Sequence, residues 1–216
     1  MAIFHLSIAT LSRSHGRNAL AAAAYRSATR LVAAQGGEIF DYSGRRAVAY
    51  VEIVLPPAAP DWAADREALW NAVERAERRQ NSTVAREFVV ALPAELTPMA
   101  RQALTLQLAG ELAARHQCAV DVAIHRPRRA GDTRNHHAHL LCSTRRLNAA
   151  GFHVKTRELD DRRSGEVAYW RQRWAMLLNA ALACADVPAR VDPRSLKAQG
   201  IARTPTVKRG VVERGP

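Results

Sequence analysis

Two short apolar segments, residues 119–126 and 138–144, constrain the fold of this chain most strongly. They read AVDVAIHR and AHLLCST, and the polar segment PRRAGDTRN lies between them. Apolar runs of this length, bounded by turn-forming residues, predict β-strands. Because the connection is of hairpin scale, we expect the two strands to be antiparallel neighbours in one sheet.

Strand-forming and helix-forming segments alternate along the rest of the chain. Strand patterns occupy residues 2–11, 46–56 and 86–93, and helical patterns occupy residues 18–34, 61–82, 97–116 and 165–187. This order predicts an α+β fold, a two-layer sandwich in which helices pack against an antiparallel sheet. We expect residues 1–216 to form a single domain, with residues 188–216 as an irregular basic C-terminal arm.

The charge balance narrows the choice of partner. The chain has 32 Lys+Arg against 20 Asp+Glu, a formal net charge of +12, which favours a polyanion such as nucleic acid. Its three cysteines at scattered spacings argue against a disulfide framework and against a cysteine zinc site, so a reducing cytoplasm is expected. The sequence shows neither a signal-peptide pattern nor an apolar run of roughly 18 residues, so no membrane span is expected.

A group of histidines is the most distinctive feature of the two apolar segments. Residues two positions apart in a strand point to the same face, so His137 and His139 share a face and His136 does not. The antiparallel pairing brings His125, at the end of its own strand, beside this pair. Three imidazoles from two strands would leave coordination positions of a metal ion open to water or substrate. The alternative is that these are ordinary structural histidines.

Two further side chains have both a functional and a structural interpretation. Glu87 opens the strand at residues 86–93, where it would accept a hydrogen bond from a metal-bound imidazole or simply be a solvated strand start. Tyr25 lies about 100° around its helix from Ala24, at the margin of the face that packs on the core. Its small neighbours leave room for a large substrate, whereas the usual fate of a tyrosine is a half-buried ring with a solvated hydroxyl. The pattern leaves both roles open.

Six segments spread along the chain carry a resemblance to one known family. They are MAIFHLS, SHGRNALAAAAYRSATRL, WAADREALWNAVERAERRQNSTVAREFVVALP, AIHRPRRAGDTRNHHAHLLCSTR, GFHVKTREL and DPRSLKAQGIARTPT. In this order they resemble the MobA/MobL family of plasmid mobilisation relaxases, within the HUH endonuclease group. The resemblance implies a relaxase-like fold and a metal-dependent enzyme that nicks and rejoins one DNA strand at an origin of transfer. The intermediate implied by the family is a covalent 5′-phosphotyrosine.

The resemblance also implies roles for individual residues. Tyr25 matches the nucleophilic tyrosine of the family, and Glu87 matches a glutamate that supports a ligand histidine. The metal-binding histidines are matched by His125, His137 and His139. The expected ion is Mg²⁺ or Mn²⁺, with Zn²⁺ or Ni²⁺ as further occupants, since three imidazoles suit several ions.

The partner implied by the resemblance is single-stranded DNA at an origin of transfer, in a bacterial cytoplasm. Accessory mobilisation proteins and the coupling protein of a secretion system are further expected partners. Eight basic residues are expected to hold DNA phosphates: Arg26, Arg30, Arg126, Arg128, Arg129, Arg134, Lys155 and Arg157. The alternative for each of them is an ordinary solvated charge.

Two other functions would use the same histidines. One is a hydrolytic metal-dependent nuclease or phosphoesterase, and the other is a non-catalytic DNA-binding protein with a structural zinc site.

Overall fold

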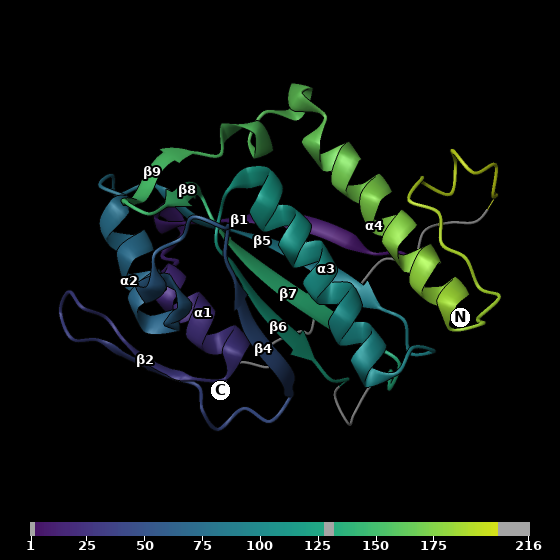
Figure 1. Cartoon of the computed structure of the whole chain (residues 1–216), viewed down its shortest axis with the longest axis horizontal. Coiled ribbons are helices and arrows are strands. Elements are labelled where there is room, and N and C mark those ends of the chain that lie inside the picture. Colours follow the sequence, from purple (N-terminus) through teal and green to yellow (C-terminus); the bar gives the residue numbers. More distant parts are fainter. Residues whose placement is uncertain (1–2, 128–131, 203–216) are drawn as a thin grey trace.

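A five-stranded antiparallel sheet with the strand order β1-β5-β7-β6-β4 forms the centre of the molecule (Figure 1). The computed structural model describes residues 3–127 and 132–202. The strands of this sheet are β1 (Leu6–Ser12), β4 (Val48–Val54), β5 (Thr83–Leu92), β6 (Val120–His125) and β7 (His136–Ser143). Two small hairpin sheets are formed by β2 (Arg30–Val32) with β3 (Ile39–Asp41) and by β8 (Arg145–Asn148) with β9 (Gly151–Lys155).

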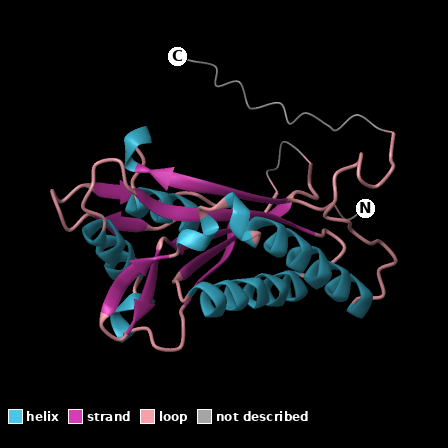
Figure 2. Cartoon of the chain, turned by 90° about the horizontal axis from the view of Figure 1, so that it is seen from above, coloured by secondary structure: helices cyan, strands magenta, loops and turns pink. Residues whose placement is uncertain are grey.

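Helices cover both faces of the central sheet. They are α1 (Ala19–Ser27), α2 (Arg66–Ala76), α3 (Pro98–His116) and α4 (Glu166–Cys184), with α3 and α4 side by side (Figure 2). Leu140 packs in the core beneath α3 and α4, whereas its neighbour Leu141 packs in the core formed with α1 and α2. The α+β class and the antiparallel sheet are confirmed. The expected two layers become three, because the central strands are apolar on both faces and each face requires a cover.

Helix α1 is shorter than its sequence pattern predicts. Its Ala28 adopts the left-handed conformation, with φ 55° and ψ 45°, and donates its N–H to the carbonyl of Ala24. A left-handed residue cannot continue a right-handed helix, so the chain turns here and forms β2. Tyr25 and Arg26 therefore lie in the last turn of α1, next to the point where the chain changes direction.

The strand pairing predicted for the two apolar segments is confirmed. Strands β6 and β7 are antiparallel neighbours, and His125 lies opposite His137 in their register. On its other side β7 pairs with β5, where Val89 lies opposite His139. The histidine strand is consequently the middle strand of the sheet, with its backbone hydrogen bonds satisfied on both sides.

The C-terminal part of the chain is described only up to residue 202. Residues 188–202 contain no helix or strand, and the remainder of the expected arm lies outside the described residues. Within the described ranges, none of the helices combines the length and the apolar character needed to cross a bilayer.

A buried ion pair fixes α2 to the sheet. The carboxylate of Asp121, in β6, accepts hydrogen bonds from Arg66 Nε at 2.9 Å and from Trp70 Nε1 at 2.8 Å. Burial raises the pKa of Asp121, and the adjacent guanidinium of Arg66 opposes this rise. A buried carboxylate without such partners would be costly, so the position of α2 depends on this contact.

We expect Asp121→Ala to lower the free energy of unfolding by about 3 kcal/mol, because the partly buried guanidinium of Arg66 and the buried indole N–H of Trp70 lose their acceptor. Urea denaturation followed by circular dichroism measures this loss. Asp61→Ala, at an exposed position outside the core, is the control and should change the value by less than about 0.5 kcal/mol. Equal effects of the two substitutions would contradict the anchoring role of Asp121.

Candidate active site

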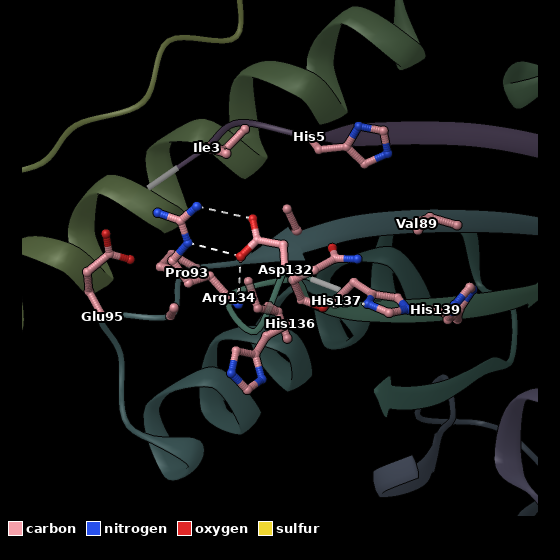
Figure 3. A pocket seen from close by; sticks show the side chains of 14 residues that line it. Ile3, His5, Val89, Pro93, Glu95, Asp132, Arg134, His136, His137 and His139 are labelled. Atoms are coloured by element: carbon pink, nitrogen blue, oxygen red, sulfur yellow. Dashed lines mark hydrogen bonds and ion pairs between the residues drawn. The ribbon is translucent and has the colours of Figure 1, made fainter. Parts of the chain in front are cut away.

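Three histidines from two neighbouring strands meet at one end of the central sheet. His137 and His139 project from the same face of β7, and His125 ends β6 directly opposite His137. One ring nitrogen from each histidine can be chosen so that all three lie within 4.8 Å of one another. The ring of His136 points away from those of His137 and His139, as the alternation of a strand requires (Figure 3).

Each of the three imidazoles has one nitrogen engaged with an oxygen atom. The acceptors are the Arg26 carbonyl for His125 Nε2, the Asn135 carbonyl for His137 Nδ1 and the Glu87 carboxylate for His139 Nδ1, at 2.8, 3.0 and 2.6 Å. Because a ring N–H donates in each pair, the other nitrogen of each ring keeps its lone pair. Metal–imidazole bonds are about 2 Å long, so small rotations of the rings would bring all three donors to one divalent cation. The donor set therefore fits such an ion.

Burial keeps the His125 ring neutral. His125 is 5% exposed, and desolvation lowers its pKa to about 4, with the positive charges of the neighbouring histidines and Arg45 acting in the same direction. The hydrogen bond to the Arg26 carbonyl only partly opposes this shift. At neutral pH the ring is uncharged, which is the form that binds a metal ion.

The carboxylate of Glu87 connects the histidines to helix α1. Burial by itself would raise the pKa of Glu87, but hydrogen bonds from Arg26 and His139 outweigh it and lower the pKa to about 2. Arg26 binds both carboxylate oxygens, with Nη2 at 2.7 Å from Oε2. The charged carboxylate in turn fixes the orientation and tautomer of the His139 ring. Arg26, which the sequence suggested as a phosphate contact, thus has its charge compensated inside the protein.

Tyr25 stands beside this network, in the last turn of α1. The residue is 39% exposed, and its ring is nearly perpendicular to the Tyr42 ring, with the centroids 5.2 Å apart. The guanidinium carbon of Arg45 lies 3.7 Å from the centroid of the Tyr25 ring. The next residue along the helix is Arg26, whose carbonyl accepts the hydrogen bond from His125. This bond joins the turn that carries Tyr25 to the strand end that carries His125.

A cavity of about 680 Å³ adjoins the histidines on the side of β1 and β5 (Figure 3). Its apolar wall includes Val89, Ala91 and Leu92, and Arg134 lies at the cavity with its guanidinium 3.0 Å from Asp132. The sequence pattern did not predict this cavity. Its lining comes from three separate stretches of chain, which only the folded sheet brings together.

The remaining basic residues predicted to bind DNA have different environments. Arg30, Arg126, Arg134 and Arg157 are exposed, and Arg128 and Arg129 lie outside the described residues. Lys155 instead lies with its Nζ 2.8 Å from the buried carboxylate of Glu77, and its side chain is only 19% exposed. Arg126 follows His125 in the chain and is therefore close to the three histidines. Lys155 is paired with Glu77 and does not lie at the histidines.

Sequence comparison relates the chain to proteins of plasmid transfer. The profile of the MobA/MobL family matches residues 17–215. The chain is 36% identical over 234 residues to the mobilization protein MobL of Acidithiobacillus ferridurans, covering 95% of this chain and 61% of that protein. It is 30% identical over 240 residues to a probable conjugal transfer protein TraA of Sinorhizobium fredii, covering 98% of this chain and 21% of that protein. The chain thus spans only part of the length of these relatives.

Structure comparison gives the same relationship. A solved structure described as the molecular basis of vancomycin resistance transfer in Staphylococcus aureus superimposes with a TM-score of 0.81. Its sequence identity is 33%, and the match covers 90% of this chain and 100% of that chain. The profile match extends over most of the sequence and the fold agrees with that of a related protein. This chain belongs to the MobA/MobL family.

Proposed function

We propose that this chain is a relaxase domain that nicks and rejoins one DNA strand at a plasmid origin of transfer. The observation that carries the proposal is the connection between the three histidines and Tyr25 through the backbone of Arg26. Membership of the MobA/MobL family, with relatives named for mobilization and conjugal transfer, supports the choice of substrate. The net charge of +12 supports a polyanionic partner.

The proposed reaction is a transesterification at one phosphodiester. The phenolic oxygen of Tyr25 forms a bond to phosphorus, and the bond from phosphorus to the 3′ oxygen breaks. The phenolic proton passes to solvent, and the leaving 3′ oxygen takes up a proton from solvent. Because one phosphate ester replaces another, the reverse attack by the 3′ hydroxyl rejoins the strand without an energy source.

The three histidines are the proposed ligands of a divalent cation, Mg²⁺ or Mn²⁺, with Zn²⁺ or Ni²⁺ as further occupants. Such an ion supplies Lewis acidity, which withdraws charge from the phosphate oxygens. The carboxylate of Glu87 accepts a hydrogen bond from the Nδ1–H of His139, and the carbonyl of Arg26 accepts one from the Nε2–H of His125. These contacts fix the tautomers that point a lone pair toward a shared ion.

The proposed DNA path runs across the histidines into the adjoining cavity. Its apolar wall can take an unstacked base, and Arg134 at its edge can hold a phosphate. Exposed Arg126 and Arg30 are proposed phosphate contacts, since cations provide most of the sequence-independent affinity for DNA. Arg157 is not part of this proposed path, because the preceding Thr156 forms a hydrogen bond with Thr144, at the end of β7 away from the histidines. Accessory mobilisation proteins and a coupling protein are proposed further partners in a bacterial cytoplasm, on the ground of family membership.

Tyr25→Phe is expected to abolish formation of the covalent protein–DNA adduct, lowering its rate by about 10³-fold or more, because the attacking oxygen is gone. The substrate is a single-stranded origin oligonucleotide labelled at its 3′ end and incubated with Mn²⁺. The adduct appears as a slowly migrating band on a denaturing gel. Tyr169→Phe, on the exposed side of α4, is the matched control and should react as wild type. Cleavage by Tyr25→Phe, or cleavage without an adduct, would instead support the hydrolytic nuclease.

His137→Ala and His139→Ala are expected to reduce Mn²⁺ binding below detection in isothermal titration calorimetry, because each removes one of three donors. Glu87→Gln should weaken binding by about 10- to 100-fold, since the ligand ring loses its charged acceptor. His136→Ala should bind Mn²⁺ as the wild type does, because its ring points to the other side of β7. If His136→Ala lost as much affinity as His137→Ala, the assignment of ligands would be wrong.

A further inference from the structure

Arg45 is a cation that the sequence pattern did not single out. Its guanidinium carbon lies 3.7 Å from the Tyr25 ring centroid, the closest of three such cation–ring stacks in the described part of the chain. The Nε atom of Arg45 is buried and finds no hydrogen-bond partner among the described residues, and no carboxylate there pairs with Arg45. In the stack of Arg115 on Tyr169, by contrast, the guanidinium is paired with Glu166. Among the described residues, Arg45 thus has no carboxylate partner, and its guanidinium stacks on one ring.

Arg45 ends a turn, residues 42–45, that lies just before strand β4. The turn is closed by a hydrogen bond of 3.0 Å from the Arg45 N–H to the Tyr42 carbonyl. The ring of Tyr42 is in T-shaped contact with the Tyr25 ring, so two side chains of one turn contact the tyrosine. Three residues after Arg45, Val48 begins β4 and pairs with His125. Tyr25 is therefore held between a helix end and a turn that both attach to His125.

We propose that Arg45 is a positioning residue for Tyr25 in the nicking reaction. This inference rests on the proposed relaxase function. A cation over an aromatic face is attracted more strongly as the ring becomes richer in electrons, and a phenolate is richer than a phenol. Arg45 thereby fixes the ring and stabilises the negative charge that develops on it as the phenolic oxygen attacks phosphorus. A guanidinium does not accept a proton, so the phenolic proton still passes to solvent.

The test compares Arg45→Gln, Arg45→Lys and Arg46→Gln in single-turnover cleavage at saturating Mn²⁺ and saturating single-stranded origin oligonucleotide. Arg45→Gln should lower the rate constant by about 10- to 30-fold. Its Kd for the oligonucleotide, measured without metal by fluorescence anisotropy, and its Mn²⁺ affinity should stay within about threefold of wild type. Arg45→Lys keeps the charge and should recover most of the lost rate. Arg46→Gln removes the same charge from the exposed neighbouring position and should react as wild type.

Each outcome separates this inference from the proposed function. If wild type formed no adduct, the relaxase proposal would fail and the role of Arg45 with it. If wild type reacted and Arg45→Gln kept the full rate constant, only the role of Arg45 would be refuted. If Arg45→Gln and Arg46→Gln lowered the rate constant equally, or if Arg45→Gln lowered only the DNA affinity, the effect would come from general positive charge. Either result would also refute the specific role of Arg45. Thermal unfolding shows whether each variant is folded. If Arg45→Gln is unfolded, the rate constant of Arg45→Lys tests the role of Arg45 instead. A rate far below wild type in the folded lysine variant would contradict the charge-based role.

Discussion

The buried carboxylate of Glu87 is the contact on which the arrangement of the site depends. It is 7% exposed and joins Arg26 of α1 to His139 of β7 from its own position in β5. A carboxylate taken out of water in this way is tolerable only when cations and hydrogen-bond donors surround it. Satisfying Glu87 therefore fixes the end of α1 against the sheet. The position of Tyr25, one residue before Arg26, follows from the same contact.

The part of the site that was predictable from sequence is the part controlled by local geometry. The period of two in a strand separates His137 and His139 from His136 without any knowledge of the tertiary fold. The short polar connection then makes β6 the antiparallel neighbour of β7, and this register brings His125 opposite His137.

What sequence reasoning missed are the partners that come from distant segments. Arg26 and Glu87 are 61 residues apart, so nothing near Arg26 in the sequence indicates that its charge is compensated. Arg45 ends the turn at residues 42–45, and its contact with Tyr25 exists only once α1 and β4 pack near His125. The early end of α1 has a similar origin, because helix propensity favours continuation through Ala28 whereas the tertiary fold turns the chain there.

These contacts give the two arginines beside Tyr25 opposite roles. Without Arg26, the negative charge of Glu87 would lie next to the histidines and repel the phosphate of the proposed DNA substrate. The bidentate pair cancels this charge while leaving Glu87 free to orient His139. The three imidazoles are uncharged when they bind a metal ion, so within the described ranges Arg45 is a cation beside Tyr25 that has no carboxylate partner. In the proposed reaction negative charge grows as the phenolic oxygen approaches phosphorus, and a preorganised cation stabilises that growth more than it stabilises the bound substrate.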